Sequence, residues 1–390
     1  MKSIIRNGKI ITNEGILPDG SVVIEDGVIS HVGNWVGEIP GYDTIDATGC
    51  YVAPGFIDLH VHGGGGHDFM DGTVEAFEQV LHTHLLHGTT SMMPTTLTST
   101  PAALTRVLDT YEKIAGTNDT GVGLLGLHIE GPYFAMNHRG AQDPRFIRAP
   151  DPDEYISLLN RYTCISRWSV APELEGALNM GLYLREKCII ASIAHTDAVY
   201  EDIRLAVQHG FTLVTHLYSG MNGVIRRGAY RFAGTVESAF LMDCLDVEII
   251  ADGKHLPVPL LQLIYKIKGP DRIALVTDAM RAAGTTHTES ILGNLENGLP
   301  VIIEEQVAML PDKTSFAGSI ATADRLVRVM WKEAGIPLSD VIKMMCHTPA
   351  KIAGVSKHKG ELSTGMDADI VIFDESVQIQ QVFIGGTRKI

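Results

Sequence analysis

The pattern of apolar and polar residues divides the chain into two β-rich ends and a different middle. Residues 1 to about 53 hold short strand-like runs separated by the turn pairs Asn7-Gly8 and Asp26-Gly27, which predicts antiparallel strands. The C-terminal end repeats this style over 360–374 and 377–384. Because neither end alone is large enough to fold stably, we expect 1–53 and 357–390 to form one small β-sandwich domain.

The middle of the chain, 54–356, alternates apolar strand-like runs with amphipathic helical stretches such as 75–87 and 323–334. This alternation predicts βα units around a parallel sheet, and eight such strands predict an α/β fold of the (β/α)8 TIM-barrel type. The predicted strands are 51–60, 89–95, 122–130, 165–171, 189–195, 211–216, 247–252 and 272–278.

Composition narrows the possible partners and compartment. The formal net charge of -15 disfavours nucleic acid and anionic membranes, so an anionic substrate would need a local basic cluster. No run approaches the roughly 18 apolar residues of a membrane span, and charges interrupt the first residues, so we expect neither membrane segment nor signal peptide. The five cysteines are scattered and never form CxxC, which favours a reducing, cytoplasmic location over a disulfide framework or a cysteine-based zinc site.

Two histidines close the first predicted barrel strand. His60 and His62 are two residues apart, so on a strand they face the same way and could bind one metal ion. The glycines at 63–66 that follow let the backbone turn sharply, and they lack the lysine and serine of a phosphate-binding loop.

Polar residues also end the other predicted strands, at the face of a barrel where catalytic groups converge. Glu130, His195 and His216 would join the two histidines as metal ligands, and Asp278 ends the last strand. Five donors exceed what one catalytic ion needs, so we expect two divalent ions bridged by Glu130, with zinc or iron favoured and manganese or cobalt also compatible. A metal-activated water together with Asp278 as proton acceptor and donor predicts metal-assisted hydrolysis.

Of the other histidines, His128 shares a strand face with Glu130, and we expect it to support the ligands from behind. The rest fall in loops or on predicted helices and should bind no metal; they include His67, His82, His84, His87, His138 and His209.

Several motifs carry a resemblance to a known family. The most specific are Leu127-His-Ile-Glu130-Gly-Pro-Tyr and Ala251-Asp-Gly-Lys-His255; the others are Pro54-Gly-Phe-Ile-Asp-Leu-His60-Val-His62-Gly, Ala194-His195-Thr, Thr215-His216-Leu-Tyr, Val276-Thr-Asp278-Ala and the closing Gly365-Met-Asp-Ala-Asp369. Over nearly its whole length the chain resembles the N-acetylglucosamine-6-phosphate deacetylases of the amidohydrolase superfamily.

The resemblance implies hydrolysis of the acetamide of an amino-sugar phosphate, with Asp278 passing the proton to the amine. It also implies that His255 contacts sugar hydroxyls and that Gln142 lies near the scissile carbonyl. In one branch of the family the Gln142 position is histidine and the HxH pair is absent, so the full pair here implies that a second metal polarises the carbonyl. The family further implies a homodimer, in which a neighbour's loop sometimes completes the phosphate site.

The segment after His216 departs from the family wording. The family usually has Leu-(Tyr/Phe)-Asn-Ala-Met and later Arg-Glu-Pro-Gly, which hold the phosphate, whereas this chain has Ser219-Gly220 and later Arg226-Arg227-Gly-Ala-Tyr-Arg231. We expect Ser219, Gly220, Arg226 and Arg227 to bind the phosphate, and the 226–231 region to be the dimer contact. The role of Arg231 stays open, as does the choice for Arg281 between a substrate contact and a loop cap.

Other functions of the same metal centre stay open. The chain could hydrolyse a non-phosphorylated N-acyl sugar, an N-acyl amino acid or a cyclic amide. The binuclear hydantoinase pattern is disfavoured because 165–171 holds no bridging lysine, and a mononuclear deaminase because no glutamate stands three residues after His216. A non-enzymatic scaffold is the third alternative, although such relatives typically lose ligands that this chain keeps. The sequence fixes neither the metal nor the sugar epimer.

Overall fold

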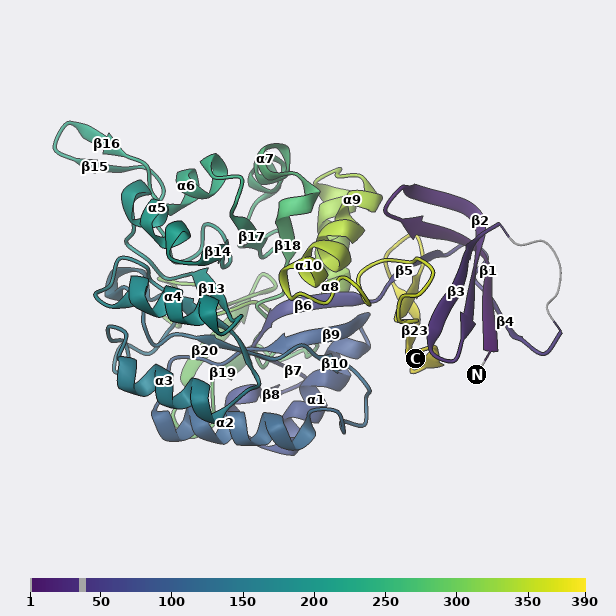
Figure 1. Ribbon diagram of the computed structural model, residues 1–390, viewed down its shortest axis with the longest axis horizontal. Coiled ribbons are helices and arrows are strands. Elements are labelled where there is room, and N and C mark those ends of the chain that lie inside the picture. The colour runs from purple at the N-terminus through teal and green to yellow at the C-terminus, as the bar shows by residue number, and fades with distance from the viewer. Residues whose placement is uncertain (1, 35–39) are drawn as a thin grey trace.

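The computed structural model describes residues 2–34 and 40–390, so Met1 and residues 35–39 of the predicted terminal domain lie outside the described residues. A barrel with helices around it fills one side of the molecule, and a smaller sheet that contains both chain ends lies on the other (Figure 1). No helix in the described ranges is long and apolar enough to cross a membrane.

Parallel strands with intervening helices form the barrel, which confirms the predicted fold class. Six strands pair in the order β11-β12-β13-β14-β17-β18, and three in the order β10-β9-β6. Parallel bridges between Thr95 and His128 and between Val61 and Ala279 join the two groups, so the barrel closes on itself. The strands are β6 (Phe56–Val61), β9 (Thr89–Pro94), β10 (Gly123–Leu124), β11 (Leu127–Glu130), β12 (Ile165–Val170), β13 (Ile190–Ile193), β14 (Phe211–Val214), β17 (Asp246–Ile249) and β18 (Ile273–Leu275).

The prediction of one continuous strand over 51–60 is wrong. The first residues form β5 (Tyr51–Pro54), which pairs with strands of the terminal sheet, and the barrel strand β6 begins only at Phe56. Gly55 connects them, and a Cβ at Gly55 would come within 2.1 Å of Thr90 Oγ1, so only glycine fits. The apolar run is unbroken because both strands are buried, so the pattern does not show the change of sheet.

Amphipathic helices surround the barrel, and both predicted examples are present. The stretch 75–87 becomes α1, whose first turn is capped by Thr73 because its Oγ1 accepts from the N–H of Ala76 at 3.2 Å. The stretch 323–334 becomes α8 and a π-helical turn, Val329–Glu333. The helices are α1 (Val74–Leu85), α2 (Pro101–Ile114), α3 (Pro152–Arg161), α4 (Ala177–Glu186), α5 (Tyr200–Gln208), α6 (Thr235–Leu241), α7 (Val258–Lys268), α8 (Ala323–Arg328), α9 (Leu338–Ile342) and α10 (Thr348–Ile352).

The two chain ends share one sheet, in the order β24-β23-β22-β5-β1-β2-β3, with β4 beside β1. The Asp26-Gly27 turn is confirmed between β2 and β3, but the predicted turn at Asn7-Gly8 is wrong. β1 runs through this pair, and a register shift against β2 with a φ of 59° at Asn7 makes it a bulge. The strands are β1 (Lys2–Thr12), β2 (Gly15–Glu25), β3 (Val28–Gly33), β4 (Asp43–Asp46), β22 (Ile370–Phe373), β23 (Ile379–Ile384) and β24 (Thr387–Arg388).

Small β elements that the pattern did not predict decorate the barrel. The hairpin of β15 (Ile225–Arg227) and β16 (Tyr230–Phe232) projects away from the helices at one end of the molecule (Figure 1). A three-stranded antiparallel sheet, β19 (Glu289–Leu292), β20 (Leu299–Glu304) and β21 (Val307–Met309), follows the last barrel strand. The short strands β7 (Gly63–Gly64) and β8 (His67–Asp68) pair just after His62.

Candidate metal centre and active-site pocket

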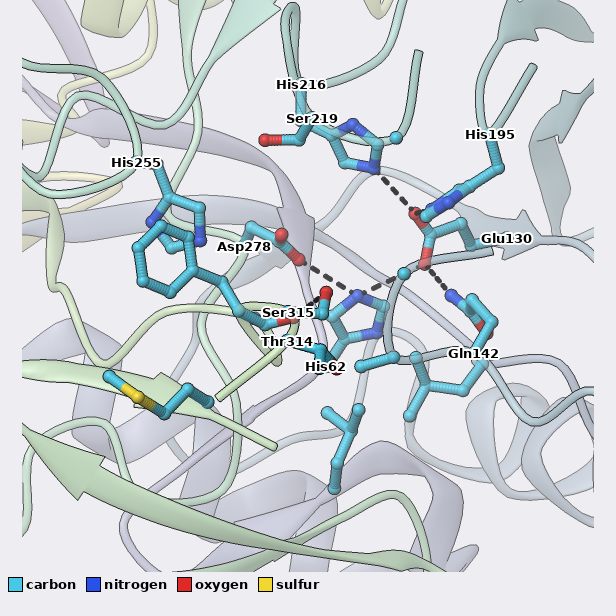
Figure 2. A pocket seen from close by; sticks show the side chains of 18 of the residues that line it. His62, Glu130, Gln142, His195, His216, Ser219, His255, Asp278, Thr314 and Ser315 are labelled. Atoms are coloured by element: carbon cyan, nitrogen blue, oxygen red, sulfur yellow. Dashed lines mark hydrogen bonds and ion pairs between the residues drawn. The ribbon is translucent and has the colours of Figure 1, made fainter. Parts of the chain in front are cut away.

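The five predicted ligands converge where the barrel strands end. The Nε2 atoms of His60 and His62 are 3.2 Å apart and lie 3.5 Å and 3.4 Å from the two carboxylate oxygens of Glu130. On the other side of Glu130, the Nε2 atoms of His195 and His216 lie 3.4 Å and 3.1 Å from Oε1, and Figure 2 shows both rings pointing at this carboxylate. Glu130 therefore belongs to two candidate metal-ligand groups, each of three buried residues.

The spacing and chemistry of these atoms fit divalent metal ions. Four ligands placed about 2.1 Å from an ion in tetrahedral geometry lie about 3.4 Å from one another. The two nitrogens of His60 and His62, and each histidine nitrogen and its nearest Glu130 oxygen, are 3.1 to 3.5 Å apart, and all these donors are imidazole nitrogens or carboxylate oxygens. Both groups therefore suit a divalent cation of the zinc or iron type.

The charges of the cluster favour a cation at its centre. Burial lowers the pKa of His60, but the carboxylates of Asp278 and Glu130 raise it more, to about 10. Burial raises the pKa of Glu130, but His60 and the hydrogen bonds from His195 and His216 hold it well below its ordinary value. The buried carboxylates thus stabilise positive charge beside them, as a metal site requires.

Backbone carbonyls fix the orientation of two of the histidines. Nδ1 of His62 donates to the carbonyl of Thr95 at 3.2 Å, and Nδ1 of His195 donates to the carbonyl of His138 at 2.8 Å. These bonds put the proton on Nδ1 and leave the Nε2 lone pair for the centre of the cluster. Nδ1 of His60 and Nδ1 of His216 are buried without a hydrogen-bond partner among the described residues.

Asp278 reaches the same cluster from the end of β18. Its Oδ1 lies 3.1 Å from Nε2 of His62 and 3.4 Å from Nε2 of His60. Its backbone N–H donates to the carbonyl of His60 at 2.8 Å, which ties the last barrel strand to the first.

Three of these residues have a left-handed backbone conformation. The φ angles are 46° at His195, 29° at His216 and 48° at Asp278. A non-glycine residue held this way costs about 1–3 kcal/mol and persists only where the surroundings fix it. The left-handed turn lies just beyond the C-terminal end of each strand.

A pocket of about 430 Å³ opens above the cluster. Asp278 lines this pocket, and so do all the candidate metal ligands except His60. The rest of the wall includes the loop residues Gly140–Gln142, Tyr218–Gly220 and Lys313–Phe316. Of the predicted substrate contacts, Gln142, Ser219, Gly220 and His255 all line it.

Gln142 contacts the shared carboxylate, which the sequence did not predict. Its side-chain NH₂ donates to Oε2 of Glu130 at 2.7 Å (Figure 2). Its side-chain oxygen accepts from the N–H of Thr98 at 2.9 Å. Both polar atoms of the Gln142 amide are therefore hydrogen-bonded, and both Gln142 and Glu130 line the pocket.

His255 is held against the pocket wall by two neighbours. Its Nδ1 lies 2.9 Å from Oδ2 of Asp252, and its ring centroid lies 4.7 Å from that of Phe316. Oδ1 of Asp252 accepts the backbone N–H groups of Lys254 and His255, each at 2.8 Å. Asp252, a strand-end residue without an assigned role in the sequence, thus orients His255.

Arg226 and Arg227 do not line the pocket of their own chain, so their predicted contact with a phosphate stays a prediction. Both are on β15 with exposed side chains; Arg226 pairs across the hairpin with Arg231, and the guanidinium of Arg227 lies over the ring of Phe232. Within the described residues, the one lysine or arginine on the pocket wall is Lys313, which the sequence analysis missed. Its loop comes after the small sheet, so no strand-end signal marked it.

Arg281 holds loops together beside the pocket. Its guanidinium pairs with Asp71 at 2.7 Å and donates to the carbonyls of Gly66 and Gly293 at 2.9 Å and 2.7 Å. With this side chain 6% exposed, the loop role fits and the substrate contact does not.

Comparisons with known proteins agree with this geometry. The amidohydrolase family model matches residues 51–389. A protein of Lysinibacillus sphaericus named N-acetylglucosamine-6-phosphate deacetylase is 33% identical, over 99% of this chain and 97% of that protein. One of Escherichia coli O157:H7 named N-acetylgalactosamine-6-phosphate deacetylase is 29% identical, over 99% of both.

Solved structures give the same picture. The crystal structure of an N-acetylglucosamine-6-phosphate deacetylase from Pasteurella multocida superimposes with a TM-score of 0.92 at 28% identity, over 100% of this chain and 99% of that one. The resemblance drawn from the sequence motifs is therefore confirmed.

Proposed function

The chain belongs to the amidohydrolase family, and from this premise we propose that it hydrolyses N-acetylglucosamine 6-phosphate to glucosamine 6-phosphate and acetate. The observation that carries the proposal is the convergence of His60, His62, His195 and His216 on Glu130, with Asp278 at 3.1 Å from His62. This arrangement suits hydrolysis of an amide, and the family relationship selects the acetamide of an amino-sugar phosphate as the substrate.

We propose two divalent ions per subunit. His60, His62 and Glu130 would hold one, and Glu130, His195 and His216 the other. Bound ions of this kind polarise a carbonyl and lower the pKa of water to about 7. Zinc and iron suit the ligands best, and manganese or cobalt are compatible.

We propose that Asp278 moves the proton in this reaction. Its carboxylate faces the cluster from the pocket side, so it can take a proton from the attacking water and deliver it to the leaving nitrogen. His60 cannot exchange a proton with a substrate in the pocket, because it is fully buried and does not line the pocket.

We propose that the sugar phosphate occupies the pocket of about 430 Å³, a size that suits a small ligand. The acetamide carbonyl would lie near Gln142, the sugar hydroxyls at His255 and the phosphate against Ser219 and Gly220. Phe316 offers an apolar surface beside His255 for a face of the ring.

The decisive test is acetate release by metal-replete protein from three substrates: N-acetylglucosamine 6-phosphate, its galactosamine epimer and unphosphorylated N-acetylglucosamine. We expect strong preference for a phosphorylated sugar, and the preference should shrink with added salt because phosphate attraction is screened. The ratio between the two phosphorylated sugars assigns the epimer. Equal turnover with and without phosphate would contradict the assignment and favour the N-acyl sugar, N-acyl amino acid or cyclic amide alternatives.

We also propose a homodimer in which the hairpin 225–232 of one subunit supplies Arg226 and Arg227 to the phosphate of the other. Support comes from the exposed side chains of the hairpin, from its projection at one end of the molecule (Figure 1) and from its absence from the wall of its own pocket. A cytoplasmic location is part of the proposal, in keeping with cysteines that are all free.

Mixing two inactive variants tests the hairpin. In a hybrid dimer of Arg227→Ala and Asp278→Asn subunits, the Arg227→Ala subunit keeps Asp278 and receives the partner's Arg227, so activity should reappear after exchange. An arginine that serves its own chain gives no recovery, because each pocket then lacks one group. Light scattering that shows only monomer would also contradict the proposal.

A further inference from the structure

A buried ion pair lies beneath the candidate metal centre and belongs to none of the roles above. Arg167 on β12 and Glu248 on β17 have fully buried side chains inside the barrel. Nη2 of Arg167 donates to Oε2 of Glu248 at 2.7 Å, and Nη1 donates to Oε1. Burying two charges is costly, and apolar residues of similar volume often stabilise a fold at least as well as a buried ion pair does. The stability of the barrel alone therefore does not explain the pair.

Every N–H of the Arg167 guanidinium has an acceptor. Besides Glu248, Nε donates to Oγ of Ser192 at 2.9 Å and Nη2 to Oγ1 of Thr215 at 2.8 Å, while Nη1 donates to the carbonyl of Leu59 at 3.2 Å. Ser192 lies on β13, Thr215 directly follows β14 and Leu59 lies on β6; these are the strands that lead to His195, His216 and His60. Arg167 therefore holds Glu248 in one position relative to the ligand-bearing strands.

Glu248 faces a ligand that otherwise lacks a partner. Its Oε2 lies 3.7 Å from Nδ1 of His60, which is fully buried and has no hydrogen-bond partner among the described residues. The opposite ring nitrogen, Nε2, points at Glu130. His62 and His195 each have an acceptor for Nδ1, and a small ring rotation would bring His60 within the about 2.7–3.2 Å of such a bond.

We propose that Glu248 is the positioning residue of His60, and that Arg167 positions Glu248. Glu248 accepts the Nδ1 proton of His60, which fixes the tautomer and leaves the Nε2 lone pair for a metal ion. The inference rests on the proposed metal centre and adds to it that the His60–His62–Glu130 site depends on a buried pair that touches neither ion nor substrate.

Metal affinity separates positioning from mere support of the fold. Glu248→Gln keeps the size of the side chain, and the double variant Arg167→Met with Glu248→Leu removes both charges so that neither is left unpaired. Metal-free protein is titrated with zinc against a competing chelator, and unfolding is followed by circular dichroism. We expect one zinc equivalent to bind about 10- to 100-fold more weakly in both variants and the other to be unchanged.

Arg272→Met is the matched control, because Arg272 pairs with Asp246 at 3.0 Å at the start of β17, away from the ligands. It should bind both equivalents as the wild type does. A folded double variant with two unchanged affinities would overturn the inference and leave the proposed function intact. A wild type that binds no zinc would instead refute the proposed metal centre itself.

A measurement on the wild-type chain decides the matter where the variants do not fold. In zinc-loaded protein labelled with ¹⁵N-histidine, Nδ1 of His60 should carry a slowly exchanging proton and Nε2 should carry none. The assignment comes from the signal lost in His60→Asn. A proton on Nε2, or none on Nδ1, would overturn the proposed role of Glu248.

Discussion

The inside of the barrel and the core of the terminal sheet are equally buried but hold opposite kinds of side chain. The terminal core is a cluster of apolar residues: Ile5, Ile10, Val22, Ile24, Ile29, Ala47, Val52, Leu362, Ala368, Ile370, Ile372 and Phe383. The barrel interior holds charged and polar groups that are no more exposed, among them Asp58, His60, His128, Arg167 and Glu248. Burial by itself therefore does not tell a stabilising core from a working one.

The difference lies in the partners of the buried groups. Nε2 of His128 lies 2.7 Å from Oγ of Ser169. This hydroxyl in turn lies 3.0 Å from Oγ of Ser192 and 3.0 Å from Oγ1 of Thr215. The His128 ring contacts that of His60 at a centroid distance of 4.8 Å, which is compatible with the supporting role expected from the sequence.

Such groups are costly even when hydrogen-bonded. Burial raises the pKa of Asp58 to about 7, although Thr277 and the backbone N–H of His60 donate to it. A domain selected only for stability would replace these groups by apolar ones. The barrel interior gives up stability to hold ligands in place, whereas the terminal sheet does not.

The largest expected effect comes from removing ligands from the barrel interior. His60→Asn with His62→Asn should reduce the bound metal from two ions to one and bring deacetylation near background, because the His60–His62–Glu130 group loses two of its three ligands. Metal analysis and acetate release measure the two effects. An unchanged metal count would mean that the HxH pair holds no ion.

Asp278→Asn should be nearly as damaging to turnover and harmless to everything else. We expect kcat to fall about 10²- to 10⁴-fold, because the amide cannot carry the proton, while metal content and melting temperature stay near those of the wild type. Steady-state kinetics beside metal analysis check this. Near-normal turnover would remove Asp278 from the mechanism.

The terminal core should respond in the opposite way. Ile24→Ala, at a side chain 1% exposed, should lower the free energy of unfolding by about 2–5 kcal/mol and leave kcat per folded molecule unchanged. Ile16→Ala on the same strand, where the side chain is 42% exposed, is the control and should cost far less. A loss of kcat in folded Ile24→Ala protein would show that the two regions are coupled.

The smallest effect concerns the pocket rim. Lys313 pairs with Glu304 at 2.7 Å, and its charge faces a pocket proposed to bind phosphate. Lys313→Ala should raise KM about two- to fivefold for the phosphorylated sugar only. Lys332→Ala removes a similar ion pair, with Glu375 at 2.7 Å, away from the pocket wall. This control should leave KM unchanged for both the phosphorylated and the unphosphorylated sugar. An equal rise in KM for the unphosphorylated sugar would exclude a phosphate contact.

Local rules of the backbone account for what could be predicted at the site. The two-residue period of a strand placed His60 and His62 on one face, and the parallel barrel put the ends of distant strands at one mouth. These two rules were enough to predict that the five candidate ligands and Asp278 lie together, although up to 218 residues separate them along the chain. They say nothing of the left-handed φ at His195, His216 and Asp278, which the surrounding structure imposes.

The errors in the strand predictions share one cause: the residues of a segment do not show which other strand the segment will pair with. Asn7-Gly8 reads as a hairpin turn, but β1 continues because β2 pairs along both of its halves, while β4 and β5 pair with its first and second half on the other side. The apolar run 51–60 reads as one strand, but β5 pairs in the terminal sheet and β6 pairs in the barrel.

The sequence by itself determined the fold class, the ligand types and the faces on which they stand, because periodicity and chemistry are properties of neighbouring residues. Only the tertiary structure decided that Gln142 reaches Glu130, that Lys313 borders the pocket and that Arg167 and Glu248 meet under His60. Arg167 and Glu248 are 81 residues apart, and such a contact forms only when the closed barrel brings their strands to one interior.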